Sequence, residues 1–178
     1  NSSLTKSGKS TRSTTRIAPE VTTEITQRRR DVAGRLAALK ADALLVTSPA
    51  NVRYLSDFTG SNGMLLLTPS ETHFFTDPRY EITASQNISG KVHIIKGPMI
   101  AGVADVIKRK RWKRIGFESG WTQYDAYLRL KENLPLGVSL VPIGRIIEQR
   151  RMLKSPAEID ILRRSVNLNS EAYSRVLQ

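Results

Sequence analysis

The segment at 76–80, TDPRY, holds the clearest set of side chains that could bind a ligand. It lies where an apolar strand is predicted to end and a helix to begin, and loops at strand ends commonly carry function. Arg79 offers a forked guanidinium that can bind an anion, and Tyr80 offers an aromatic wall beside it. Asp77 suits a helix cap, which explains the Asp but not the Arg-Tyr pair. A purely structural alternative is that Arg79 only pairs with a carboxylate such as Glu81.

The stretch FTGSNG at 58–63 is the second place where side chains could reach a ligand. No charge-relay pair is placed near Ser61 by the sequence, so a serine nucleophile is unsupported. The glycines match neither GxGxxG nor GxxxxGK[ST], and a turn with positive φ is the expected reason for Gly60 and Gly63. The secondary candidates of this stretch are Phe58, Ser61 and Asn62.

Two histidines and one basic run carry weaker signals. His73 and His93 lie inside predicted strands without a further ligand at the spacing of a zinc motif, so we expect strand histidines rather than metal ligands. The run KRKRWKR at 108–114 encloses an aromatic residue, as a stacking surface for nucleic acid requires. It also falls at the end of a predicted helix, where cations complement the helix dipole and Trp112 can turn inward. Nucleic-acid binding is therefore the less favoured interpretation.

Composition restricts the class of protein. With 178 residues, 39% hydrophobic and 25% charged, the chain suits one soluble domain with appendages. Its apolar runs are far shorter than the roughly twenty residues of a membrane helix. The absence of cysteine excludes disulfides, thiolate metal sites and a cysteine nucleophile.

The formal charge of +12 is partly concentrated in a Ser/Thr-rich leader, residues 1–22, which we predict to be a flexible arm. Its composition also fits an organelle-targeting peptide, although the chain begins with Asn1. Without such targeting, a cytoplasmic location is expected. The leader's basic residues are Lys6, Lys9, Arg12 and Arg16.

The elements that position these residues follow from hydrophobic periodicity. A helix is predicted from Thr23 to about Lys40, with Leu36 inward and the arginines at 28–30 largely outward. Strands are predicted at 43–47, 64–68, 72–76, 92–96, 114–118 and 138–143, and further helices at 77–87, 101–112 and 122–134, the last opened by a Thr122/Asp125 capping pair. The stretch 48–63 is expected to be irregular. The result is an α/β domain at 23–150, with a six-stranded mixed sheet flanked by helices in three layers.

A final helix is predicted after Ser155, which sits at the N-cap, with a proline next and Glu158 at the third position. Its apolar residues share one stripe and no stop signal follows. We therefore expect a segment further along to cover this stripe. The stripe consists of Ile159, Leu162, Val166, Tyr173, Val176 and Leu177.

Three segments together resemble the creatinase/prolidase family. They are NVRYLSDFTGSNG with the following hairpin and TDPRY, then RIGFE, then IIEQRRMLKSPAEIDILRRSV, in this order. The resemblance implies an N-terminal domain with a ribonuclease H-like mixed sheet, followed by a "pita-bread" catalytic domain. That second domain holds two divalent metals, manganese or zinc, through two Asp, one His and two Glu. Most members hydrolyse the bond before proline.

The resemblance assigns 151–178 to the linker and first helix of a missing catalytic domain, the chain having been cut there. It implies no catalytic residue and no metal site in this chain. Arg79 and Tyr80 match the family's Arg-Tyr and are expected to reach a substrate or an adjacent subunit, while Pro78 stands where the family more often has a small residue. The implied partners are the chain's own catalytic domain, a second copy in a homodimer, and short Xaa-Pro peptides.

Aminopeptidase P is the member most similar to this sequence. Creatine amidinohydrolase has the same architecture and is an alternative. A further alternative is a metal-free peptide-binding or assembly module of the histone-chaperone type, as in the large subunit of FACT.

Overall fold

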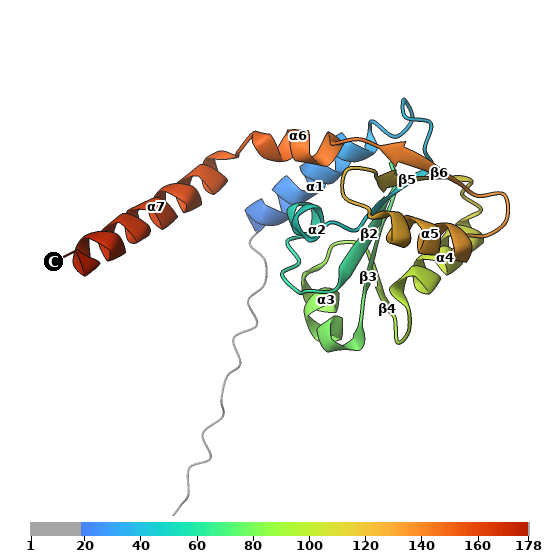
Figure 1. Cartoon of the computed structure of the whole chain (residues 1–178), viewed down its shortest axis with the longest axis horizontal. Helices are drawn as coiled ribbons and strands as arrows, with labels where there is room; N and C mark the ends of the chain where they lie inside the picture. Colours follow the sequence, from blue (N-terminus) through green and yellow to red (C-terminus); the bar gives the residue numbers. More distant parts are fainter. Residues whose placement is uncertain (1–18, 178) are drawn as a thin grey trace, which may run out of the picture.

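The computed structural model describes residues 19–177 and is built around a six-stranded mixed sheet with helices on both faces (Figure 1). The strands are β1 (Ala43–Val46), β2 (Gly63–Leu67), β3 (Thr72–Thr76), β4 (Lys91–Ile94), β5 (Arg114–Glu118) and β6 (Ser139–Ile143). The helices are α1 (Pro19–Ala33), α2 (Pro49–Ser56), the 3₁₀ turn η1 (Pro78–Tyr80), α3 (Glu81–Asn87), α4 (Met99–Lys110), α5 (Tyr124–Asn133), α6 (Ile146–Met152) and α7 (Pro156–Val176). The predicted α/β class, the six strands and the mixed sheet are confirmed.

The strand order is β4-β3-β2-β1-β5-β6. The hairpin β2–β3 is antiparallel, with Leu65 opposite Phe74, and β1 is antiparallel to β2. The outer pairs β3–β4 and β5–β6, and the pair β1–β5, are parallel. The sheet is mixed because β2 alone runs opposite to the other five strands.

Side chains of the central strands alternate between two cores. Leu44 and Val46 pack with α1, α2, α3 and α6 on one face, whereas Ala43 and Leu45 pack with α4 and α5 on the other. Successive residues of a strand point to opposite faces, so a strand covered on both sides is apolar throughout. The helices on the two faces complete the predicted three layers (Figure 1).

The stretch between β1 and β2 corrects one prediction, because 49–56 forms helix α2 rather than irregular chain. Ser48 stands at the N-cap, without a side-chain capping hydrogen bond, and Pro49 follows in the first turn, a position that proline favours. Val52 and Leu55 bury one face of this helix. Asp57 then ends it in the left-handed conformation, with φ of 58°, which Asp tolerates better than most residues.

Helix α1 differs from the prediction at both ends. It starts at Pro19, inside the predicted leader, and ends at Ala33 rather than near Lys40. Tight turns follow up to Lys40, whose φ of 52° is left-handed, and Leu36 is nevertheless fully buried as predicted. Residues 1–18 of the predicted leader lie outside the described part of the chain. A second error concerns Arg29, which is 7% exposed although it was predicted to face outward.

Three further differences lie in the C-terminal half. Helix α6 was not predicted at all, and α4 begins at Met99, two residues early. Helix α5 begins at Tyr124 after Gln123 and lacks the predicted capping pair. The capping box of α7 is confirmed, because Ser155 and Glu158 satisfy each other's backbone N–H groups.

Helix α7 extends away from the sheet (Figure 1), and none of its residues is buried. The predicted apolar stripe is present but uncovered, from Ile159 at 37% exposed to Val176 at 83%. Among the helices at 19–177, none has both the length and the apolar character to span a membrane.

Candidate functional site

The six residues proposed from the sequence lie together where β3 passes into η1, beside the loop between α2 and β2. Asp77 is at the centre. Its Oδ1 accepts hydrogen bonds from Arg79 N and Nε, both at 3.0 Å, and its Oδ2 accepts from Arg79 Nη2 at 2.8 Å. Asn62 Nδ2 also donates to Oδ2, at 2.7 Å. These donors hold the pKa of Asp77 well below its usual range.

Asp77 therefore acts as a fixed anion that orients two other groups rather than as a proton donor. It caps η1, as predicted, and it pairs with Arg79, whereas the alternative partner Glu81 does not. The Arg79 side chain is 69% exposed, with one edge of the guanidinium on Asp77. The remaining edge can bind an anion from outside the domain.

Tyr80 links this turn to the neighbouring loop. Its hydroxyl accepts a hydrogen bond from Ser61 N at 3.2 Å and lies 3.0 Å from Ser61 Oγ. These contacts lower the pKa of Tyr80. Its ring meets the buried Phe58 ring edge-on, with centroids 5.2 Å apart, and the Arg79 guanidinium lies 5.4 Å from the Tyr80 centroid. Tyr80 is thus held in one orientation by packing and hydrogen bonding.

The two glycines of the loop are explained by close approach rather than by positive φ, which neither adopts. A Cβ on Gly60 would come within 2.3 Å of the Phe58 ring and 2.7 Å of Tyr80. A Cβ on Gly63 would come within 2.9 Å of Phe58. The prediction of left-handed glycines is therefore wrong, and the glycines allow the aromatic pair to sit against the backbone.

Sequence reasoning missed a buried polar network at the carboxyl ends of β1 and β5, two inner strands of the sheet. Glu118 Oε2, at the end of β5, accepts from the backbone N–H groups of Thr47 and Ser48, at 2.6 and 2.8 Å. Its Oε1 accepts from Asn51 Nδ2 at 2.7 Å. Asn51 is fully buried and completes its hydrogen bonds with Glu148 Oε1 at 2.7 Å and Arg151 Nη1 at 3.0 Å. This network joins β1, α2, β5 and α6.

A largely apolar cavity of about 460 Å³ lies near the same strand ends, between β1, β5 and α5. Phe117 and Leu130 line it, and the half-exposed Trp121 stands at its border. Cavities of this size and character can hold small ligands. No motif in the sequence pointed to it.

The two histidines pair with each other. His73 Nδ1 lies 2.9 Å from His93 Nε2, the rings stack, and Trp112 meets His73 edge-on. Trp112 is partly buried against the core on this face of the sheet, as predicted. Glu71 Oε2 is 3.4 Å from His73 Nε2, a contact too long and poorly aligned for a good hydrogen bond. Within residues 19–177, no group of three or more His, Cys, Asp or Glu side chains is arranged to hold a metal ion.

Comparison with known proteins identifies the family of this chain. The sequence pattern of the Creatinase/Prolidase N-terminal domain matches residues 28–153, well over half of the chain. The chain belongs to this family. Its creatinase/prolidase N-terminal domain thus includes the Asp77–Tyr80 turn, the Glu118 network and helix α6.

The relatives of this domain are peptidases. The chain is 33% identical over 141 residues to the uncharacterized peptidase YqhT of Bacillus subtilis, covering 78% of this chain and 39% of the relative. It therefore spans about two fifths of the curated relative that it matches.

Two solved structures show the same fold. An Xaa-Pro dipeptidase from Bacillus anthracis superposes with a TM-score of 0.79 and 25% identity, over 86% of this chain and 43% of that one. The N-terminal domain of the cytoplasmic peptidase PepQ from Mycobacterium tuberculosis superposes with a TM-score of 0.64 and 31% identity, over 69% of this chain and 97% of that one.

The segments that carry the family resemblance meet in space within this creatinase/prolidase domain. Asn51, Glu118 and Arg151 come from the three separate segments and contact one another directly or through Asn51. A second contact connects α7 to the domain, because Arg28 Nη2 lies 3.0 Å from Glu158 Oε1. The guanidinium of Arg28 also stacks over the ring of Tyr54. The resemblance therefore identifies mainly the residues that fix α6 and the start of α7.

Proposed function

We propose that the chain is the N-terminal domain of an Xaa-Pro metallopeptidase, most like aminopeptidase P, and that it serves assembly and access control rather than chemistry. The likeness to a dipeptidase structure at a TM-score of 0.79, over less than half of that chain, is the observation that carries the proposal. In the parent protein, a catalytic domain would follow α7.

The uncovered face of α7 supports this arrangement. Its apolar residues have no counterpart in the N-terminal domain, whereas the helix start is fixed by the capping box and by Arg28. A helix that is anchored at one end and apolar along one side is suited to pack on a further domain. Two divalent metals, manganese or zinc, bound in that domain would supply hydrolysis by activating water and polarising the carbonyl.

The Asp77–Tyr80 turn is the part of this domain proposed to face the active-site cleft, in the same subunit or in the partner of a homodimer. Arg79 is exposed and oriented by Asp77, and Tyr80 is fixed against Phe58. Such a preorganised cation beside an aromatic ring can bind the carboxylate of a short peptide. We also propose that the protein is located in the cytoplasm.

The test is to express the reading frame past Gln178 and to assay Xaa-Pro peptides with added manganese. The extended protein is expected to hydrolyse them, and the 178-residue chain alone is not. In the extended protein, Arg79→Ala is expected to lower kcat/KM about tenfold, because one charge-assisted hydrogen bond to the substrate is lost. The Tm is expected to change little.

The exposed Lys108→Ala provides the control, because it removes the same charge from α4. Hydrolysis by the 178-residue chain, or an extended protein without activity, would contradict the peptidase assignment. An unchanged kcat/KM with a large fall in Tm would show that Arg79 is only structural.

A further inference from the structure

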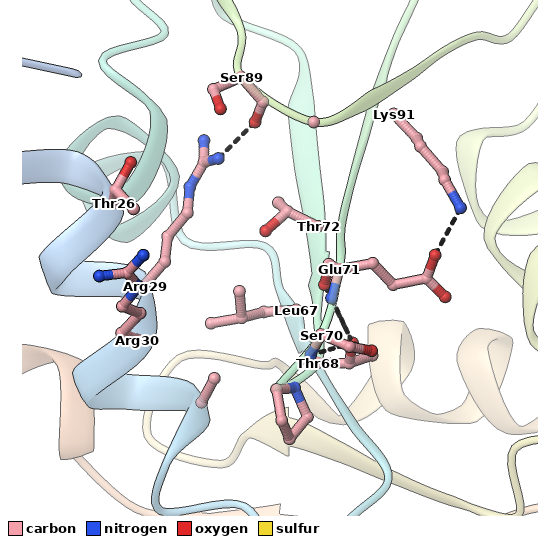
Figure 2. Close-up of a pocket in the computed structure, with 13 residues that line it drawn as sticks. Thr26, Arg29, Arg30, Leu67, Thr68, Ser70, Glu71, Thr72, Ser89 and Lys91 are labelled. Carbon is pink, nitrogen blue, oxygen red and sulfur yellow. Dashed lines mark hydrogen bonds and ion pairs between the residues drawn. The ribbon is translucent and has the colours of Figure 1, made fainter. Parts of the chain in front are cut away.

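A cavity of about 360 Å³ lies between α1, the β2–β3 turn and the start of β4 (Figure 2). Its walls are rich in hydrogen-bond donors. Three of its lining side chains are cations, Arg29, Arg30 and Lys91, and one is an anion, Glu71. The lining therefore has a surplus of two positive charges.

The single anion of the cavity is already neutralised by lysines. Glu71 Oε2 lies 2.5 Å from Lys91 Nζ, and Glu71 Oε1 lies 2.5 Å from Lys110 Nζ. Figure 2 shows the carboxylate turned toward Lys91. These lysines lower the pKa of Glu71 to about 2. The two arginines are thus left without a carboxylate partner among the side chains that line the cavity.

Arg29 is the unusual member of this set. It is 93% buried, since only 7% of its surface is exposed. Its Nε donates to Leu55 O at 2.6 Å and its Nη1 donates to Ser89 O (Figure 2). Its buried Nη2 has no hydrogen-bond partner. Burial lowers the pKa of Arg29 to about 10, the expected response of a cation that has lost water without gaining an anion.

Hydroxyl groups complete the cavity. Thr72 lies between the arginine side and the β2–β3 turn, and Ser70 and Ser89 stand at the two ends (Figure 2). Together with two guanidinium groups, these hydroxyls provide more donors than the two oxygens of a carboxylate can accept. A phosphate group has more acceptor oxygens and carries up to two negative charges, which matches the charge surplus.

We propose that this cavity binds a phosphate group, either as inorganic phosphate or as the monoester of a small molecule, through Arg29, Arg30 and the hydroxyl of Thr72. The volume exceeds that of a phosphate group and leaves room for a small organic body. The buried Nη2 of Arg29, which has no hydrogen-bond partner, is the donor that this ligand would satisfy.

The test is titration calorimetry of the 178-residue chain with inorganic phosphate and, separately, with glycerol 3-phosphate, at constant ionic strength set by chloride. Arg30→Ala and Thr72→Val are expected to weaken binding, the former about tenfold, because a charged hydrogen bond is lost. Arg29 donates its hydrogen bonds to backbone carbonyls of Leu55 and Ser89 and not to Arg30 or Thr72, so both variants are expected to fold. Lys108→Ala changes the net charge as Arg30→Ala does, lies outside the cavity, and is expected to bind as the parent does.

Tighter binding of glycerol 3-phosphate would identify a phosphorylated small molecule as the ligand class, and equal or tighter binding of inorganic phosphate would identify free phosphate. The proposal is overturned if neither probe gives binding heat above the chloride control. It is equally overturned if Lys108→Ala weakens binding as much as Arg30→Ala, since the effect would then be one of net charge alone.

Discussion

The carboxylate of Asp77 illustrates how one residue sets the properties of its neighbours. All four of its hydrogen bonds come from Arg79 and Asn62, so it fixes the guanidinium in a plane and leaves the outer edge free. The Arg29 guanidinium is oriented in a different way, by backbone carbonyls inside the domain. Arg79 is therefore available at the surface, whereas Arg29 is buried and contributes positive charge to the wall of the cavity beside α1.

The His73–His93 pair makes the stability depend on pH. Its hydrogen bond at 2.9 Å needs one N–H and one lone pair, so full protonation of both rings breaks it. Burial, mainly, lowers the pKa of both histidines below 6.5, and in His93 the neighbouring His73 and Arg109 add to the shift. For His73, Glu71 opposes the shift while the adjacent lysines at 91 and 110 reinforce it.

Since the unfolded chain binds these protons near 6.5 and the folded chain only at lower pH, the unfolded state holds more protons in between. We expect the free energy of unfolding to have its full value above pH 6.5 and to decrease as the pH falls below 6.5, by at most about 1.4 kcal/mol per pH unit for each proton.

Urea unfolding between about pH 7.5 and pH 5 measures this decrease. His73→Gln with His93→Gln should flatten the curve in this range; an equal slope would assign the effect to other groups. Glu71 acts only at lower pH, below its ordinary 4.5.

At the scale of elements, Glu118 holds α2 and α6 on the sheet. Its carboxylate lies at the start of α2, where the backbone N–H groups of Thr47 and Ser48 point at it. Open α/β sheets often bind an anionic ligand at such a position, between a strand end and a helix start. Here the protein's own carboxylate fills that place, and Asn51 extends the contact to α6.

Glu118→Gln is expected to destabilise the domain by about 2 kcal/mol, because the amide keeps only one acceptor oxygen and its NH₂ group must face the donors on the other side. Thermal unfolding followed by circular dichroism measures the loss. Glu132→Gln on the exposed face of α5 is the matched control and should leave Tm unchanged. A Glu118→Gln protein as stable as the parent would show that the network contributes specificity without net stability.

At the scale of the whole molecule, α7 is the element that the N-terminal domain does not bury. Leu162 and Val166, on its apolar stripe, are 51% and 60% exposed. Substitution at an exposed position usually changes stability by no more than about 0.5 kcal/mol. The stripe therefore contributes little to this domain and is available to a further one.

Leu162→Glu is accordingly expected to leave the Tm of the 178-residue chain unchanged and to lower that of the extended protein by several degrees, because a charge would be buried there. Differential scanning calorimetry on both proteins checks this. The exposed Ser174→Glu, off the stripe on the same helix, is the control. A lower Tm in the 178-residue chain would mean that α7 packs on its own domain in solution.

The sequence by itself determined what depends on neighbours along the chain. Short apolar runs bounded by turn residues predicted the six strands, and the capping box of Ser155 and Glu158 predicted the start of α7. The grouping of Asp77, Arg79 and Tyr80 is also local, whereas Phe58, Ser61 and Asn62 were only secondary candidates until the fold brought them against this turn. These features arise from short-range hydrogen bonds and side-chain periodicity, which a sequence displays directly.

Only the tertiary structure decided which polar residues are buried. The Asn51 contacts with Glu118 and Arg151 join residues 67 and 100 positions apart, and Arg29 reaches Ser89 over 60 positions. Nothing local distinguishes Arg29 from Arg28 or Arg30, because its burial depends on carbonyl groups that the fold brings alongside α1. Helix α2 was missed for a different reason, since its single buried face is short and its proline start was read as a loop. Buried polar partners are long-range contacts, so they follow from the fold and not from the pattern.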